Sequence, residues 1–383
     1  MKGSADDAAW MRRALSLARK GLGETNPNPM VGCVIVKDGR VVGEAFHRRA
    51  GEDHAEISAL HRAGPAARGA TLYVTLEPCA HQGRTPPCAP VVAAAGVRRA
   101  VVAIRDPNPL VDGGGLRALR RAGIFVSVGV AETEARALNT RFLVAASGRR
   151  PFVLLKAAVT LDGRIATASG RSRWITSPAQ RKAARGLRRL HDGVAVGIGT
   201  VLADDPMLLP SPAVARPFVR VVFDSRLRLP LDSRLVRSAR RWPVWVLTRP
   251  GASRRRASLE ERGVIVIDVP GRGARVVLPT ALRILRRRGV WSLMVEGGSE
   301  ILGSFLAART FDELALFRAP LLLGGKGSLS AFGGPDPRGV AAAVRMTPVA
   351  RPLVPREVDN ALLFEAWRPT RPRARRSSRR RTR

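Results

Sequence analysis

Short apolar runs alternate with segments of helical spacing along almost the whole chain, and this alternation restricts the fold to the α/β class. In the N-terminal part, a helix is predicted over residues 7–20. A β-hairpin, MVGCVIV–KDGR–VVGEAF, follows and turns at Asp38-Gly39. The pattern continues as β-α-β-α-β and ends in the helix AETEARALNTRFL. One hairpin followed by such a series predicts a three-layer α/β domain.

A second α/β pattern begins after SGRRP at 147–151, a polar segment that ends in proline. Predicted strands include FVLLKAAV, GVAVGIG, FVRVVF, PVWVLT, GVIVIDV, WSLMVEGG and ELALFRAPLLL, and helices such as PAQRKAARGLRRL, LPTALRILRRRG and SEILGSFLAAR alternate with them. Repeated β-α alternation predicts a mostly parallel sheet that binds ligands at the carboxyl ends of its strands. We therefore predict two domains, at 1–146 and 151–368.

The net charge of +36 has two interpretations. A basic surface could bind nucleic acid or an anionic substrate. However, six lysines stand against sixty arginines, which favours an arginine-biased coding composition over a designed surface. Eight of the arginines follow Thr370 in a segment without large apolar residues, so residues 369–383 are predicted to be a disordered tail. Nucleic acid is therefore not expected as the main partner.

Composition also bears on the compartment. No run of eighteen apolar residues is present, so no membrane association is expected. The first residues lack the apolar stretch and the cleavage site of a signal peptide. Three cysteines do not make a disulfide framework. These features together predict a cytoplasmic protein.

Two of the three cysteines lie in the stretch LEPCAHQGRTPPC, downstream of the triplet HAE. A zinc deaminase needs three nitrogen or thiolate ligands, an open position for water and a carboxylate that moves protons. A helix is predicted to start at His54 and to end at Gly64-Pro65, and Cys88 opens the next helix after Cys79. Positive partial charge at two helix N-termini would favour the thiolate forms. The pattern predicts a catalytic zinc with Glu56 as proton carrier.

A structural zinc site is the alternative, because Cys33 or His81 could supply a fourth ligand and leave no position for water. Cys33 lies inside the strand MVGCVIV and is more typical of a small core residue. His81 could instead contact the substrate.

Four stretches of the first half, TNPNPMVGCVIV, GEDHAE, YVTLEPCAHQGRTPPC and RDPNPLVDGGG, together resemble the deaminase half of the bifunctional riboflavin-biosynthesis deaminase/reductase family. The eight-residue gap with GRTPPC is typical of that family, whereas tRNA-adenosine and cytidine deaminases usually have a two-residue gap. The resemblance implies a cytidine-deaminase-like fold and a His54/Cys79/Cys88 zinc site. It also implies substrate contacts from Asn28, His47, His81, Arg84 and Asp106. Taken singly, Asn28 could only shape a turn, and His47 could be an exposed strand end.

In the second half, the stretch LKAAVTLDGRIATASGRSRWIT predicts a strand that leads into a loop suited to the mouth of a small-molecule site. MVEGGSEILGSF places Glu296 at a strand end before a helix whose N-terminus could bind an anion. This signal is weak, since a tight turn capped by Ser299 explains it equally well. Trp174 could likewise be only a core residue.

Together these blocks resemble the pyrimidine reductase half of the same family, whose fold is similar to dihydrofolate reductase, and the resemblance covers residues 8–368. It implies NADPH contacts at Ala158, Trp174, Thr200, Asp204, Ser225, Gly298, Ser299, Glu300, Ile301, Leu302, Gly303 and Ser304. It implies reductase substrate contacts at Ser172, Arg188, Leu208 and Glu296. One departure concerns the segment DDPMLLPSPAVARP, in which no arginine stands at the spacing where the family has one for the substrate phosphate. Either Arg216 or another cation substitutes for it, or the reductase binds its substrate weakly.

The resemblance implies a bifunctional enzyme that binds one zinc ion per chain and NADPH and forms a homo-oligomer. It would deaminate 2,5-diamino-6-ribosylamino-4(3H)-pyrimidinone 5′-phosphate and then reduce the ribosyl side chain to give 5-amino-6-(5-phospho-D-ribitylamino)uracil. The alternative is a nucleic-acid-editing zinc deaminase with a basic tail. A third hypothesis makes the tail a tether for nucleic acid on an inactive scaffold.

Overall fold

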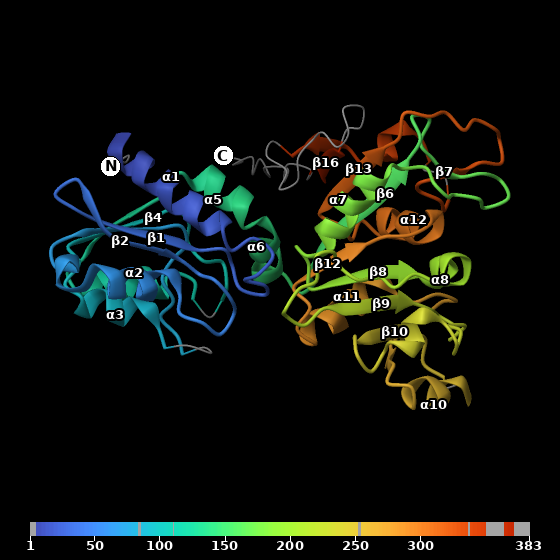
Figure 1. Ribbon diagram of the computed structural model, residues 1–383, viewed down its shortest axis with the longest axis horizontal. Helices are drawn as coiled ribbons and strands as arrows, with labels where there is room; N and C mark the ends of the chain where they lie inside the picture. The colour runs from blue at the N-terminus through green and yellow to red at the C-terminus, as the bar shows by residue number, and fades with distance from the viewer. Residues whose placement is uncertain are drawn as a thin grey trace, which may run out of the picture. The chain divides into compact units, whose positions relative to one another are not determined.

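The computed structural model describes residues 5–82, 86–109, 111–251, 254–335, 338–349 and 364–370. The chain forms two compact units (Figure 1). Unit 1 comprises Met1–Val153 and Arg181–Val295, and unit 2 comprises Leu154–Gln180 and Glu296–Arg383. Within the described residues, every helix is too short or too polar to cross a lipid bilayer.

The N-terminal part of unit 1 is built on a five-stranded mixed sheet with the strand order β2-β1-β3-β4-β5. β1 is antiparallel to both β2 and β3, whereas β3, β4 and β5 are parallel to one another. The predicted hairpin is confirmed, and both turn residues adopt positive φ, 49° at Asp38 and 70° at Gly39. The strands are β1 (Gly32–Lys37), β2 (Arg40–Phe46), β3 (Thr71–Val74), β4 (Arg99–Val102) and β5 (Phe125–Val128).

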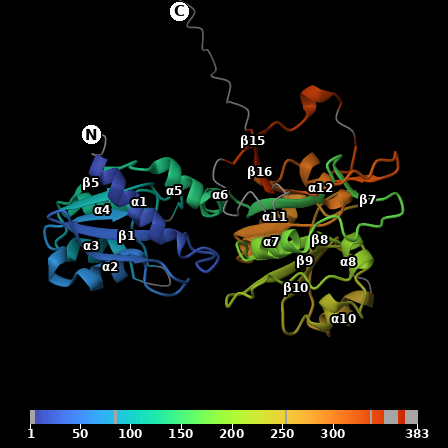
Figure 2. The ribbon, with the colours of Figure 1, turned by 45° about the horizontal axis from the view of Figure 1, so that its top comes forward.

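Helices cover both faces of this sheet, as the three-layer prediction required. Figures 1 and 2 show α1 and α5 on one face and α2 and α3 on the other. The helices are α1 (Ala5–Arg19), α2 (Ala55–Ala63), α3 (Cys88–Ala94), α4 (Gly114–Arg121), α5 (Glu132–Leu138) and α6 (Thr140–Ser147), and a short 3-10 helix spans Gly64–Ala67. His54 directly precedes α2 and Cys88 begins α3, so two of the predicted ligands lie at the N-termini of these helices.

The segment AETEARALNTRFL was predicted as one helix, and this is wrong. It forms α5 and α6, which are separated at Asn139. The Asn139 side chain accepts a hydrogen bond from the Met30 backbone N–H at 2.9 Å and donates one to the Met30 carbonyl at 2.8 Å. This buried pairing holds Asn139 at φ −104° and ψ 19°, outside helical geometry.

The remainder of unit 1 contains parallel strands in the order β11-β10-β9-β8-β12. Every neighbouring pair is parallel, which confirms the prediction from β-α alternation. The strands are β8 (Gly193–Gly197), β9 (Val219–Phe223), β10 (Val244–Thr248), β11 (Ile265–Asp268) and β12 (Ser292–Val295). The helices are α7 (Pro178–Arg188), of which the greater part belongs to unit 1, α8 (Ile198–Asp204), α9 (Arg234–Arg237), α10 (Arg254–Glu260) and α11 (Leu278–Arg287).

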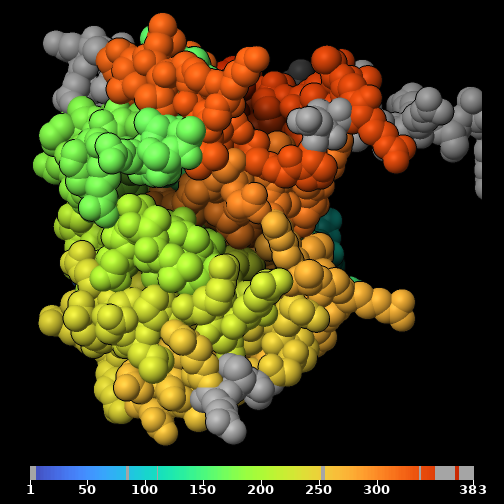
Figure 3. Space-filling model, turned by 90° about the vertical axis from the view of Figure 1, so that its right-hand side faces the viewer, coloured from blue at the N-terminus to red at the C-terminus, as the bar shows by residue number. Residues whose placement is uncertain are grey.

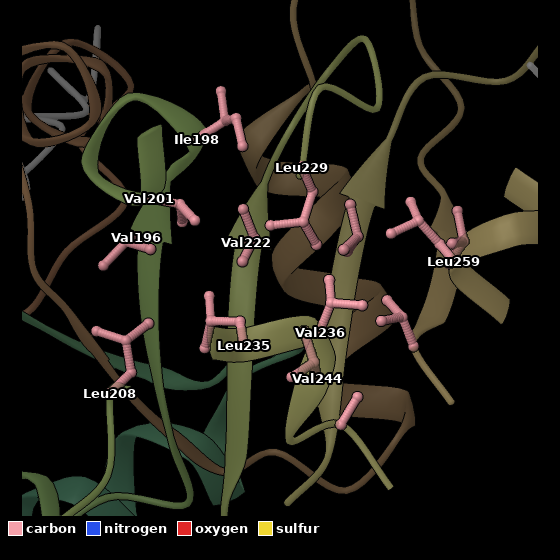
Figure 4. Close-up of a cluster of buried hydrophobic side chains, with 14 of the residues drawn as sticks. Val196, Ile198, Val201, Leu208, Val222, Leu229, Leu235, Val236, Val244 and Leu259 are labelled. Carbon is pink, nitrogen blue, oxygen red and sulfur yellow. The ribbon is translucent and has the colours of Figure 1, made fainter. Parts of the chain in front are cut away.

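A buried apolar cluster fixes these strands against the helices and loops that follow them (Figure 4). Val196 of β8 and Val222 of β9 lie together with Leu229, Leu235 and other fully buried side chains. The fully buried Arg220 lies at the N-terminal end of β9. Its guanidinium donates to the carbonyls of Met207 and Trp242 and to the Ser238 hydroxyl. Burial lowers the pKa of Arg220 to about 10.

Unit 2 contains β6 (Phe152–Val159), β13 (Glu313–Arg318), β16 (Phe364–Pro369) and β15 (Met346–Pro348), paired in that order. β6 and β13 are parallel, and the other two pairs are antiparallel. A smaller sheet pairs β7 (Arg164–Ala166) with β14 (Leu329–Ser330), and the green and orange segments that carry them lie side by side in Figure 3. The unit also contains α12 (Ser299–Ala307) and a 3-10 helix at Val340–Ala342.

Two sequence boundaries in unit 2 require correction. The strand predicted over ELALFRAPLLL ends at Arg318, two residues before Pro320, which lacks the N–H that a ladder needs. The tail predicted to begin at 369 can begin only after 370. Pro369 pairs with Met346, and the Thr370 N–H donates to the Arg345 carbonyl at 2.8 Å. Residues 371–383 lie outside the described residues.

Candidate active site

The candidate metal ligands come from three elements that meet at one end of the N-terminal sheet. His54 is the N-cap of α2, in extended conformation, and Cys88 is the first residue of α3. Cys79 lies in the loop that follows β3. A parallel strand that ends where two helices begin brings these side chains together, although they are far apart in sequence.

The geometry of the three side chains suits a single metal ion. His54 Nδ1, Cys79 Sγ and Cys88 Sγ all lie within 4.8 Å of one another. His54 Nδ1 is 3.2 Å from Cys88 Sγ and 3.7 Å from Cys79 Sγ, and the Cys88 N–H donates to Cys79 Sγ at 3.3 Å. One imidazole and two thiols are the donor types that zinc prefers, so the residues fit the metal.

Neither candidate fourth ligand joins this group among the described residues. Cys33 is fully buried in β1, and burial raises the pKa of its thiol well above the usual value. It is a core residue, as its sequence context suggested. A three-ligand set leaves a position for water, which favours the catalytic over the structural interpretation of the site.

Electrostatics around the ligands differ for the two thiols. The hydrogen bond with Cys88 and the contact with His54 lower the pKa of the Cys79 thiol. The shared hydrogen bond and burial raise the pKa of Cys88. Glu56, the second residue of α2, is only 3% exposed, and this burial raises the pKa of its carboxyl. A buried carboxyl with a raised pKa is suited to carry protons near neutral pH.

A cavity of about 340 Å³ opens onto these groups. Four of the five predicted substrate contacts line it, namely Asn28, His47, His81 and Asp106. The fifth, Arg84, lies outside the described residues. Asn28 Nδ2 is 3.1 Å from His47 Nε2, and His47 Nδ1 is 3.0 Å from the Asp53 carbonyl.

Two of these residues have properties that point to a ligand. His81 Nδ1 is buried without a hydrogen-bond partner among the described residues, so a bound molecule would satisfy it. Asp106 is 6% exposed, and burial raises the pKa of its carboxyl to about 6. The Asn108 N–H donates to Asp106 Oδ1 at 2.8 Å and fixes the carboxyl in the cavity wall.

Glu77 is a functional residue that the sequence analysis missed. Its buried carboxylate accepts four backbone N–H groups, from Asp106, Gly113, Gly115 and Leu116, at 3.0–3.2 Å. The loop that carries Asp106 is therefore held by one side chain that also borders the cavity. An acidic residue shortly after a buried strand, in LEPC, was the available signal. Two aromatic residues, Phe142 and Trp291, also line the cavity and had no sequence signal.

Three predicted cofactor contacts of unit 1 lie after the carboxyl ends of its parallel strands. Thr200 and Asp204 are on α8, which directly follows β8, and Ser225 follows β9. The Ser225 hydroxyl accepts the Val276 N–H at 3.0 Å. Arg188, on α7, donates to the Leu209 carbonyl at 2.8 Å.

Arg216 was one candidate for the cation missing from the segment after Pro206, and the structure argues against this candidate. The Arg216 side chain is only 10% exposed and lies 3.6 Å from Asp192. Its guanidinium donates to the carbonyls of Gly23, Arg189 and His191. Because these groups occupy it, Arg216 stabilises unit 1 instead of meeting a phosphate. Leu208, the predicted contact in this segment, is buried with φ 54°.

The predicted reductase residues of unit 2 lie on β6, on the following loop and around α12. Ala158 is in β6, Ser172 and the exposed Trp174 follow it, and Glu296 directly follows β12. The exposure of Trp174, 68%, excludes the core alternative. At the N-terminus of α12, a Cβ on Gly298 would meet nothing within 4 Å. This open helix end fits a dinucleotide phosphate.

The seven predicted cofactor contacts at the N-cap and in α12 are not equivalent. Ile301, Leu302 and Gly303 are buried, and the Ser304 hydroxyl donates to the Glu300 carbonyl. A Cβ on Gly303 would lie 1.8 Å from the Gly333 carbonyl oxygen, so helix packing alone requires that glycine. The accessible part of the segment is its N-terminus.

Comparison with known proteins agrees with this geometry. Residues 4–104 match the family described as the cytidine and deoxycytidylate deaminase zinc-binding region, and residues 151–350 match the RibD C-terminal domain. A riboflavin biosynthesis protein RibD from Aquifex aeolicus is 46% identical over 320 residues, which is 83% of this chain and 88% of the relative. The chain belongs to the RibD family.

Other RibD proteins are similarly close. The protein from Escherichia coli is 42% identical over 344 residues, which covers 83% of this chain and 89% of the relative. The solved structure of Acinetobacter baumannii RibD has a TM-score of 0.83 at 39% identity and covers 95% of this chain and 99% of that one. A deaminase/reductase structure from Thermotoga maritima has a TM-score of 0.81 at 36% identity, with the same coverage.

Family membership confirms a bifunctional enzyme of riboflavin biosynthesis, with a deaminase half and a reductase half. It also confirms the predicted fold classes, a cytidine-deaminase-like domain followed by a RibD-type reductase domain similar to dihydrofolate reductase. Zinc and NADPH are its cofactors. The nucleic-acid-editing alternative is not favoured.

Proposed function

We propose that the N-terminal half removes the 2-amino group of 2,5-diamino-6-ribosylamino-4(3H)-pyrimidinone 5′-phosphate by hydrolysis. The C-terminal half then reduces the ribosyl side chain with NADPH, which gives 5-amino-6-(5-phospho-D-ribitylamino)uracil. The observation that carries the proposal is that Glu56, His54 and Cys79 line one cavity, with the Cys88 donor atom within 4.8 Å of those of His54 and Cys79.

The proposed metal site uses the three donors described above, and Glu56 performs the proton transfers. Zinc, when bound, supplies Lewis-acid chemistry that makes water nucleophilic near neutral pH. Glu56 accepts one proton from the attacking water and delivers it to a ring nitrogen, then takes the second proton from the hydroxyl now on the ring carbon and delivers it to the departing amine. The reaction consumes one water and releases ammonia as the bond between the ring carbon and the exocyclic 2-amino nitrogen breaks and a C–O bond forms. Burial raises the pKa of the Glu56 carboxyl, so this group can both accept and donate a proton near neutral pH.

The polar side chains of the cavity orient the substrate in this proposal. Asn28 offers amide groups that complement a pyrimidine edge, and its contact with His47 fixes both side chains. His81 offers an unpaired ring nitrogen to the ligand. Asp106 lies in the wall of the same cavity, and Arg84 is proposed to meet the phosphate.

For the reductase, we assign the NADPH pyrophosphate to the open N-terminus of α12 within unit 2. The other cofactor contacts proposed from the family resemblance are Ala158, Trp174, Thr200, Asp204 and Ser225. The substrate contacts proposed from it are Ser172, Arg188, Leu208 and Glu296. The cofactor donates a hydride, and the protein supplies binding and orientation.

The proposed setting is the cytoplasm, which agrees with three cysteines that form no disulfide. A phosphorylated pyrimidine, and not nucleic acid, is the proposed partner. A homo-oligomer is proposed from the family resemblance alone.

The decisive experiment supplies zinc-loaded protein with the diamino substrate and NADPH and follows ammonia release and NADPH oxidation in one vessel. The wild type is expected to give both signals, with oxidation lagging behind ammonia. Glu56→Gln is the matched control, because it removes proton transfer while retaining the shape of the side chain. It should reduce ammonia release by about 10²–10⁴-fold. NADPH oxidation with the already deaminated substrate should be unchanged.

Other outcomes separate the two halves. Ammonia release without oxidation would retain the deaminase assignment and contradict the reductase assignment. Absence of both signals from folded, zinc-loaded protein would contradict the whole proposal.

A further inference from the structure

One wall of the deaminase cavity comes from the half of the chain that matches the reductase family. The residues lining the cavity include Trp291, which directly precedes β12 and lies within the RibD C-terminal match. The other lining residues that the structure describes all precede residue 143. Trp291 belongs to the same compact unit as the whole deaminase half.

The Trp291 ring is held from several sides. It stacks on Phe142 of α6 with a centroid distance of 5.8 Å and an interplanar angle of 2°. The Arg286 guanidinium lies 3.6 Å from the centre of the Trp291 ring, and Arg286 Nε donates to the Ala145 carbonyl. Phe142 and Ala145 both lie on the deaminase side, on α6. The stacked Phe142 and Trp291 rings and the Arg286 guanidinium therefore restrict one another's side-chain conformations in the cavity wall.

The Asp192 carboxylate constrains the backbone of Trp291 and also contacts Asn26 in the deaminase half. Asp192 Oδ2 accepts the Trp291 N–H at 2.9 Å and the Ser292 N–H at 2.8 Å. The other oxygen, Asp192 Oδ1, accepts Asn26 Nδ2 at 3.1 Å. Asn26 precedes Asn28, a proposed substrate contact, by two residues. One buried side chain of the reductase half thus fixes two walls of the deaminase cavity.

We propose that Trp291, supported by Phe142 and Arg286, is a positioning residue for the deaminase substrate. This inference rests on the proposed function. The substrate contains a planar pyrimidine, and the cavity offers polar groups at Asn28 and His81 and a flat apolar surface at the aromatic wall. The wall limits where the ring can lie relative to Glu56 without taking part in the proton transfers. The reductase half therefore contributes to substrate binding in the deaminase half.

The test compares full-length, zinc-loaded Trp291→Ala with wild type in initial rates of ammonia release. We expect KM to rise by about tenfold, because aromatic contacts contribute on this scale, and kcat to change by less than about threefold. Trp291→Phe should restore most of the wild-type KM, since it keeps a ring. Trp245→Ala is the matched control, because Arg288 lies over that ring too, at 5.9 Å, but Trp245 does not line this cavity.

Turnover of NADPH with the already deaminated substrate checks folding of every variant. If Trp291→Ala does not fold, Trp291→Leu keeps apolar volume without the plane and should show the same rise in KM. A KM within about twofold of wild type in a folded Ala or Leu variant would overturn the inference alone. The same holds if Trp245→Ala raises KM equally. Absence of ammonia release from the wild type would instead overturn the proposed function.

Discussion

At the scale of single residues, Glu77 determines the position of the loop that carries Asp106. The carboxylate accepts four backbone N–H groups, whereas a glutamine amide has one oxygen and would turn its N–H₂ toward donors. Glu77→Gln is expected to lower the free energy of unfolding by about 2–4 kcal/mol and to raise KM for ammonia release. Urea titration and initial rates measure the two effects.

The matched control is Glu44→Gln, at a carboxylate whose partner is the partly exposed Arg13. Its effect on unfolding should remain below about 1 kcal/mol, because such pairs are screened by solvent. Equal effects of the two substitutions would contradict the role assigned to Glu77.

His191 makes the stability of unit 1 depend on pH. It is 1% exposed, stacks on Phe152 at 6.1 Å, and burial lowers the pKa of its imidazole well below 6.5. The folded state keeps this ring neutral while the unfolded chain binds a proton below pH 6.5. The stabilisation that comes from keeping His191 neutral is therefore complete above pH 6.5. As the pH falls below 6.5, the free energy of unfolding decreases by about 1.4 kcal/mol per pH unit.

His191→Phe should flatten this acid dependence, because phenylalanine has no proton to gain. The measurement is the free energy of unfolding between about pH 4.5 and 6.5 for both proteins. His61→Phe is the control at an exposed ring, with 71% side-chain exposure, and should leave the slope unchanged. Parallel curves for wild type and His191→Phe would show that another group causes the dependence.

At the scale of elements, α12 combines a packing role and a binding role in two glycines. In Gly303→Ala, the new methyl would lie 1.8 Å from the Gly333 carbonyl oxygen, so the helix or its neighbour must move. We expect this variant to lose about 1–3 kcal/mol of stability. Gly298→Ala has open space and φ −81°, so its cost should be below about 1 kcal/mol.

The Gly303→Ala and Gly298→Ala variants should also differ in their KM for NADPH. A methyl at Gly298 lies where the cofactor pyrophosphate is proposed and should raise KM for NADPH several-fold. Thermal denaturation and NADPH titration distinguish the effects. An unchanged KM in Gly298→Ala would place the pyrophosphate elsewhere.

At the scale of the whole molecule, the chain joins two chemistries that need different cofactors. Removal of zinc with a chelator should abolish ammonia release, because the thiolate and imidazole donors then hold no metal. Oxidation of NADPH with the already deaminated substrate should continue at the wild-type rate. Readdition of zinc should restore ammonia release, and metal analysis should give one ion per chain. Loss of both activities on zinc removal would contradict separate sites.

Much of the molecule could be predicted from local sequence. Alternation of apolar runs predicted both sheets, and the residue types in HAE and LEPCAHQGRTPPC predicted the metal set that the structure brings within 4.8 Å. The break at Asn139 could not be predicted, because its partner Met30 lies 109 residues away. For the same reason nothing local showed that Arg216 is occupied by the carbonyls of Gly23, Arg189 and His191.

The sequence by itself determined the fold class, the donor types and the proton-carrying carboxylate, since these follow from periodicity and from the chemistry of adjacent residues. Only the tertiary structure decided that Glu77 holds the Asp106 loop and that Trp291 closes the deaminase cavity. Hydrogen bonds to backbone groups and stacked rings depend on the positions of segments distant along the chain. Packing of the whole unit sets these positions, and no local sequence pattern predicts them.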